Sequence, residues 1–232
     1  MSADGHAVAE QVRRTLPPPE SWTNPTGYRG SLALCVIDSV FSLRAAYSST
    51  VAVVNRYRAA RQQAGADPEI DGLGELVAAI DSVGGPRTAA GPALFDNRGY
   101  APGTARRGTE GVLKSEAIYS AATAMRHAGI DSTEDLREQL SSGRAAWLGV
   151  RGLGWVSWDY LLMLTGADGV KADTMVQRFV ATSVGAPAVS GERAKVAVID
   201  AAALLEVDAR VLDHAIWLHQ RKQGAAQPES SR

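Results

Sequence analysis

Residues 148–173 read LGVRGLGWVSWDYLLMLTGADGVKAD, and the rest of the chain is interpreted outward from this stretch. An apolar run enters a tight turn at 150–154, and a second apolar run at 157–164 has the spacing of a helix. Gly152 and Gly154 tolerate backbone angles that side chains forbid, so the turn can be short. The sequence therefore predicts two helices joined by a tight corner.

The corner of such a hairpin is a natural place for a phosphate. Backbone N–H groups in the first turn of the second helix lack partners within that helix, and they carry the positive end of its dipole. Arg151 adds positive charge at the same place. A plain helical hairpin explains the same glycines, so the turn by itself leaves a structural and a DNA-binding role open.

A second feature follows the hairpin along the chain. Residues 165–172 form a loop of small and polar residues, and residues 174–180 then carry apolar side chains at helical spacing. Asp173 stands where the N-cap of that helix belongs. It is therefore either a plain N-cap or a carboxylate held at a helix N-terminus for chemistry.

Together these features resemble the helix-hairpin-helix DNA glycosylase superfamily, most closely its monofunctional, alkylpurine-glycosylase-like branch. The signature of the superfamily is a hairpin of the form L-x-G-[VIL]-G-x-x-[ST], a helix, a loop, and an aspartate that opens the next helix. In this chain the matching residues are Val150, Gly152, Leu153, Gly154, Ser157 and Asp173. The resemblance implies an all-α, two-lobed fold with a DNA-binding cleft that holds the aspartate.

Helical periodicity predicts about nine or ten helices, and no stretch shows a convincing strand pattern. The expected parts are a mobile N-terminal arm (1–20), a first lobe (21–71 with 166–220), a second lobe (72–165, with the hairpin at 148–164) and a disordered tail (221–232).

The resemblance assigns the chemistry to Asp173. Breaking a base–deoxyribose bond builds positive charge on the sugar, so a carboxylate beside the anomeric carbon stabilises the transition state. Superfamily members that also cut the sugar–phosphate backbone carry a lysine two residues after the second hairpin glycine, and this chain has Val156 there. We therefore expect a glycosylase without lyase activity, which leaves an abasic site.

The resemblance also suggests the residues around the DNA. Those expected at the DNA backbone are Arg151, Gly152, Leu153, Gly154, Trp155 and Ser157. Those expected to line the base pocket or to fill the gap left by the base are Ser39, Phe41, Ser42, Arg44, Tyr47, Trp155 and Trp158. The alternative for the aromatic residues is core packing, and Trp158 stands where a small residue is usual.

No cofactor is expected. The single cysteine, Cys35, excludes a cysteine-ligated iron–sulfur cluster, and the histidines lack the spacing of metal ligands. Hairpins of the superfamily often bind a structural monovalent cation through backbone carbonyls, here those of Leu148, Val150 and Leu153. The sequence itself does not reveal such an ion.

The expected partner is double-stranded DNA, bound by a monomer in the cytoplasm at the nucleoid and not at a membrane. A formal net charge of −1 argues against nucleic acid unless basic residues cluster, as Arg98, Arg106 and Arg107 do in a loop near Tyr100. Two alternatives stay open: a non-catalytic helix-hairpin-helix module that binds DNA, and a helical protein-interaction domain. The excised base is not readable from the sequence, and the role could be repair or bacterial defence against phage DNA with modified cytosines.

Overall fold

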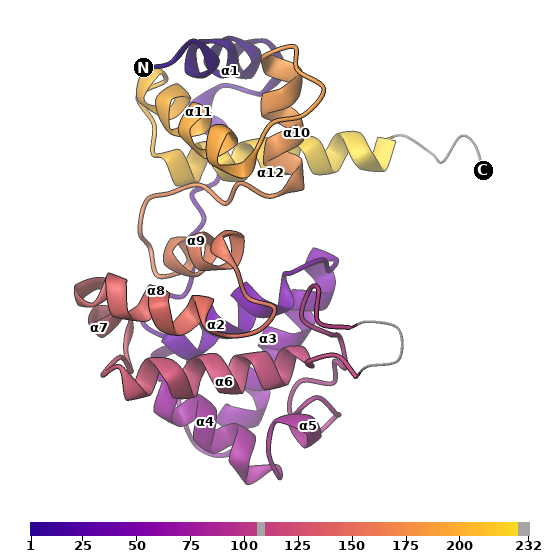
Figure 1. Cartoon of the computed structure of the whole chain (residues 1–232), viewed down its shortest axis with the longest axis vertical. Helices are drawn as coiled ribbons and strands as arrows, with labels where there is room; N and C mark the ends of the chain where they lie inside the picture. The colour runs from indigo at the N-terminus through magenta and orange to yellow at the C-terminus, as the bar shows by residue number, and fades with distance from the viewer. Residues whose placement is uncertain (106–109, 227–232) are drawn as a thin grey trace. The chain divides into compact units, whose positions relative to one another are not determined.

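The computed structural model describes residues 1–105 and 110–226, with side chains as far as Gln223. Over these residues the predicted all-α fold is confirmed: they form twelve α-helices and two short 3-10 turns, more helices than expected, with no strand (Figure 1). The chain divides into two compact units, one of residues 1–26 with 167–232 (unit 1) and one of residues 27–166 (unit 2).

Unit 2 is built around one buried helix. Every residue of α2 (Leu32–Phe41) is buried, because this run is apolar on all sides except at Asp38 and Ser39. The helices that pack around it or complete the unit are α3 (Tyr47–Gln63), α4 (Leu73–Ser82), α5 (Pro86–Ala89), α6 (Lys114–His127), α7 (Thr133–Glu138), α8 (Leu140–Leu148) and α9 (Trp155–Leu164), with a 3-10 turn at Pro68–Ile70. The main apolar core of the protein is the one that surrounds α2.

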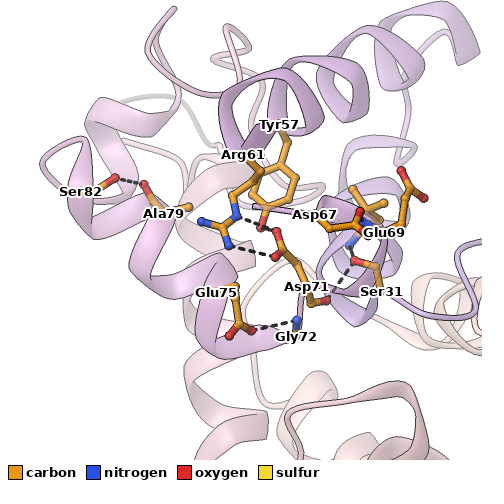
Figure 2. Close-up of polar contacts among 11 residues, drawn as sticks. Ser31, Tyr57, Arg61, Asp67, Glu69, Asp71, Gly72, Glu75, Ala79 and Ser82 are labelled. Atoms are coloured by element: carbon orange, nitrogen blue, oxygen red, sulfur yellow. Dashed lines mark hydrogen bonds and ion pairs between the residues drawn. The ribbon is translucent and has the colours of Figure 1, made fainter. Parts of the chain in front are cut away.

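A buried carboxylate ties three of these helices together (Figure 2). Asp71, just before α4, accepts hydrogen bonds from the Tyr57 hydroxyl (2.8 Å) and from Nε and Nη2 of Arg61 (2.7 and 2.9 Å) on α3. Its backbone carbonyl accepts from the hydroxyl of Ser31, the N-cap of α2 (3.0 Å). The network fixes the start of α2 against α3 and α4.

Unit 1 joins the two ends of the chain. It contains α1 (Ala3–Thr15), a 3-10 turn (Pro19–Ser21), α10 (Thr174–Ser183), α11 (Gly191–Leu204) and α12 (Ala209–Ala226). Val8 and Val12 of α1 are buried in a second apolar core with Phe179 of α10 and Val198 of α11. Unit 1 therefore has a core of its own.

Three expectations about the organisation are wrong. The N-terminal arm is an ordered helix, because Ser2 caps α1 and the valines of α1 pack on α11. Residues 27–71 group with 72–166 and not with the C-terminal helices, because α2 forms the centre of unit 2. In the expected tail, α12 continues to Ala226, while residues 227–232 lie outside the described part of the chain.

Candidate functional site

The predicted pair of helices with a tight corner is confirmed by α8 and α9. Gly152 has a φ of +94°, and a Cβ there would lie 2.6 Å from Cβ of Ala101 and 2.8 Å from Cγ2 of Thr104. Only glycine therefore fits both the backbone conformation and the space. Leu153 N donates to the carbonyl of Val150 (3.1 Å), which closes the turn and engages one of the three carbonyls proposed for a cation.

Ser157 organises this corner from inside the protein. Its hydroxyl accepts from Gly154 N (3.1 Å) and from Nε1 of Trp147 (3.1 Å), and it donates to the carbonyl of Gly154 (2.7 Å). The Ser157 carbonyl accepts from the hydroxyl of Ser39 on α2 (2.7 Å). Because the Ser157 hydroxyl is buried and saturated with hydrogen bonds, the side chain of Ser157 does not contact the DNA backbone, where this residue was expected.

The outer face of the corner is open and basic. Trp155, the first residue of α9, is 58% exposed, and Cζ of Arg144 lies 5.5 Å from the centre of its ring. Arg151 is exposed and donates from Nη2 to the Thr104 carbonyl (3.0 Å), which holds its guanidinium beside the turn. The first turn of α9 contains no acidic residue, and its first backbone amides have no carbonyl partner within the helix. This face offers N–H groups, two guanidinium groups and an indole.

The prediction that Asp173 caps a helix is confirmed. Asp173 in unit 1 is the N-cap of α10, and its Oδ1 accepts from Met175 N (2.8 Å) and Val176 N (3.1 Å). The side chain is only partly buried. The loop before it is held by α12: Asp168 accepts from Arg210 N (2.8 Å), and Asp213 accepts from Lys171 N (3.1 Å).

Asp213 places a second carboxyl group near Asp173. It is almost completely buried, and its pKa is raised well above the ordinary value, first by burial and then by the charge of Asp173. Lys171 opposes this shift in pKa, through its charge and through its backbone N–H. The Asp173 loop therefore rests on a carboxyl group that tends to hold a proton.

Three residues predicted for the base pocket lie in the core instead. Phe41 is 1% exposed and packs on Phe95, with ring centres 5.3 Å apart, and Ser39 is fully buried against Ser157. Trp158 is buried where a Cβ on Gly143 would lie 3.3 Å from its Cη2, so the missing side chain of that glycine makes room for a tryptophan. None of the three can reach a nucleotide, and their assignment to the pocket or wedge is wrong.

Apart from Trp155 on α9, the remaining pocket candidates lie in the connection between α2 and α3 and at the first residue of α3. Ser42 is half-buried, Arg44 is exposed with a φ of +49°, and Tyr47 is 49% exposed. Whether any of these residues contacts a nucleotide stays a prediction.

A polar cluster that the sequence did not reveal lies on α2. Asp38 is buried and accepts from the hydroxyl of Tyr28 (2.8 Å), and the half-buried Tyr160 of α9 also hydrogen-bonds to it. Burial and the charge of Asp38 raise the pKa of both phenols, so they stay protonated as donors. The available signal was a single acidic residue within an apolar helical run.

Comparison with known proteins assigns a family. Residues 6–221 match the family described as Domain of unknown function (DUF8548). The chain belongs to this family. No curated protein and no solved structure matches it.

Three further findings concern this DUF8548 chain. Among the described residues, no group of three or more histidines, cysteines and acidic residues is placed to hold a metal ion, and no helix is long and apolar enough to cross a membrane. Of the three arginines predicted near Tyr100, Arg98 is exposed, and Arg106 and Arg107 lie outside the described residues.

Proposed function

We propose that this chain is a monofunctional DNA glycosylase, which extrudes a damaged or modified base from duplex DNA, hydrolyses its N-glycosidic bond and leaves an abasic site. One observation carries the proposal: a glycine corner with an open basic face is followed in the chain by a carboxylate that caps the next helix. The corner belongs to unit 2 and the carboxylate to unit 1, so each can be tested with its own variants.

The hairpin corner between α8 and α9 is the part of the protein that binds the DNA backbone in this proposal. A phosphate oxygen can approach the amides of Trp155 and Val156 because a Cβ on Gly154 would meet nothing within 4 Å, which shows that the space in front of it is open. Arg151 and Arg144 add charge, and the exposed face of Trp155 can pack on a sugar or base.

Asp173 supplies the chemistry. Both cap hydrogen bonds go to Oδ1, so the orientation of the carboxylate is fixed, and the N-terminus of α10 favours its negative charge. In the reaction the electron pair of the N-glycosidic bond leaves with the base. The carboxylate then stabilises the cationic sugar while a water oxygen bonds to the anomeric carbon, and the proton that this water loses ends on the departed base.

Recognition of the base is assigned to the exposed residues at the connection between α2 and α3. Arg44 and Tyr47 offer hydrogen-bonding groups and an aromatic ring to an extruded base. Polar side chains of this kind suit a base that carries hydrogen-bonding substituents, such as the glucosylated hydroxymethylcytosine of some phage DNA.

The deciding experiment separates the role of Asp173 as the N-cap of α10 from its proposed role in catalysis. Duplexes with alkylated, oxidised, mismatched or glucosylated bases are incubated with the protein and heated in alkali to reveal abasic sites. Asp173→Asn and Asp173→Ser keep a good N-cap, so we expect folding stability within about 0.5 kcal/mol of the wild type but excision at least 100-fold slower.

Ser190→Ala is the matched control, because it removes the N-cap of α11 and no proposed catalytic group. It should cost about 1 kcal/mol of stability and leave excision unchanged. Excision at the wild-type rate by Asp173→Ser on every processed substrate would refute the assignment of Asp173.

A non-catalytic DNA-binding module is the second candidate. It is favoured by the two cap hydrogen bonds, which by themselves give Asp173 a complete structural role. This candidate predicts salt-dependent binding to every duplex tested, with no abasic site on any of them.

A further inference from the structure

The connection between α2 and α3, residues 42–46, is called the α2–α3 loop below. Its residues 44–46 are exposed, as is Tyr47 at the start of α3. Arg44 has a φ of +49°, in the left-handed region that non-glycine residues seldom adopt. A conformation of this kind persists only where neighbouring contacts hold it.

The contact that holds this loop comes from Lys114, the first residue of α6. Its Nζ donates to the carbonyl of Phe41 (3.0 Å), the last residue of α2, and to the carbonyl of Leu43 (2.7 Å). These carbonyls have no partner further along α2, because the helix has ended. A side chain from a distant part of unit 2 therefore serves as the C-terminal cap of α2.

This is a costly way to end a helix. Lys114 is 5% exposed and takes part in none of the ion pairs formed among the described residues. Burial lowers the pKa of its amine to about 8. A glycine after the helix would satisfy such carbonyls without burying a charge. The cost indicates that the conformation of the loop matters beyond the end of the helix.

Residues 95–99, which precede α6 in the chain, support the α2–α3 loop from its inner side. Phe95 packs on Phe41, and Nδ2 of Asn97 donates to the hydroxyl of Ser49 near the start of α3 (3.4 Å). The backbone N–H of Lys114 donates to the carbonyl of Gly99 (2.8 Å), which ties this segment to α6. Both flanks of the loop are thereby fixed while Arg44 and Tyr47 stay exposed.

We infer that Lys114 is a positioning residue, which does not touch DNA but holds the α2–α3 loop in the conformation that presents Arg44 to the DNA. The inference rests on the proposed function and deepens it. It assigns the rigidity of the DNA-engaging loop to one buried amine.

The test uses the full chain and a duplex that carries a tetrahydrofuran abasic-site analogue. Amide hydrogen exchange is followed at residues 43–47 and at the hairpin corner, with and without DNA. In the wild type we expect both regions to become protected on binding. In Lys114→Met the amide protection of the loop should fall at least about tenfold, while the hairpin stays protected. The affinity for the DNA duplex should fall less than about threefold.

Three further variants separate positioning from folding. Lys114→Gln keeps an N–H donor and should restore part of the protection. Insertion of two glycines between Arg44 and Ala45 frees the loop while Lys114 stays in place, so it replaces Lys114→Met if that variant does not fold. Lys222→Met, at an exposed lysine of unit 1, should behave as the wild type.

The failure of the inference and the failure of the proposed function give different results. Equal loop protection in the wild type, Lys114→Met and the insertion variant overturns the inference alone. The same holds if DNA protects the wild-type hairpin but never the loop. If DNA protects no part of the wild-type protein, both proposals are overturned.

Discussion

At the scale of single residues, Lys114 gives the stability of the protein a distinct pH dependence. Its folded pKa of about 8 lies below the ordinary lysine value of 10.5, so the unfolded chain binds more protons between these two values. The free energy of unfolding of the wild type should therefore rise relative to that of Lys114→Met, by up to about 3 kcal/mol between pH 8 and 10.5. Urea denaturation of both proteins across this range measures the difference.

The comparison with Lys114→Met is needed because three phenols act in the opposite sense. The pKa values of Tyr28, Tyr57 and Tyr160 are raised by burial, so above pH 10 the folded protein retains protons that the unfolded chain loses. They destabilise wild type and variant alike at high pH, and the difference isolates the lysine. A difference that stays constant from pH 7 to 10.5 would contradict a depressed pKa for Lys114.

Which residues could be assigned from the sequence depended on how local their interactions are. Asp173 was predicted as an N-cap because its partners, Met175 and Val176, follow it directly. Phe41 was misassigned because its partner, Phe95, lies far along the chain. Lys114 was missed although Ala117, Ile118 and Ala121 of the same helix face form the core.

At the scale of elements, the two glycines of the hairpin should behave differently. Gly152→Ala places a Cβ 2.6 Å from Cβ of Ala101 at a φ of +94°. We therefore expect this variant to lose about 2 kcal/mol of folding stability, and to lose DNA binding as well. A Cβ on Gly154 meets nothing within 4 Å and its φ is −154°, so Gly154→Ala should cost about 1 kcal/mol or less. Thermal unfolding measures both changes.

The DNA affinity of Gly154→Ala is the informative measurement. Its methyl group would stand in front of the amides proposed to bind phosphate, and the affinity should fall about tenfold in a protein that is otherwise intact. Unchanged affinity in this variant would place the phosphate elsewhere.

Two ion pairs of α3 offer a second comparison. The Arg61–Asp71 pair is buried at Asp71 and includes the Tyr57 hydroxyl (Figure 2), whereas the Glu69 side chain of the Arg58–Glu69 pair is 52% exposed. Asp71→Asn should therefore cost about 3 kcal/mol of stability, because it leaves Arg61 without its counter-charge. Glu69→Gln should cost less than about 1 kcal/mol. If denaturation with guanidinium chloride showed the same loss of stability for Asp71→Asn and Glu69→Gln, the greater importance of the buried pair would be contradicted.

Most element positions followed from the sequence, since capping and apolar spacing act within a few residues. The helices expected at 157–164 and 174–180 are found as α9 and α10. A distant side chain also holds the start of α12, because Asp168 accepts hydrogen bonds from Ala209 N and Arg210 N although it lies about 40 residues earlier in the chain. Helix α1 was missed because its valines are stabilised by α11, which is remote in sequence.

At the scale of the whole molecule, the division into units could not be derived from local patterns. Whether α2 belongs with the C-terminal helices or with α6 and α9 is decided by which apolar faces fit together, and no short stretch of sequence encodes that. The residue patterns located the helix pair and the N-cap at Asp173 correctly along the chain, whereas the expected lobe boundary at residue 71 is wrong, because the first unit boundary follows residue 26.

The net charge of −1 makes the salt dependence of binding the sharpest test of a DNA partner. If DNA is held at the hairpin corner, the logarithm of the affinity should fall linearly with the logarithm of the salt concentration, with a slope of about −0.9 for each phosphate contacted. Arg144→Gln and Arg151→Gln should each reduce that slope by about 1, because both guanidinium groups stand at the corner. Arg193→Gln serves as control, since Arg193 already pairs with Asp4 in unit 1 (2.6 Å) and should leave the slope unchanged. Fluorescence anisotropy between 50 and 200 mM salt would measure the DNA affinity of each protein. Equal slopes for all three variants would mean that the protein binds DNA through some other surface or not at all.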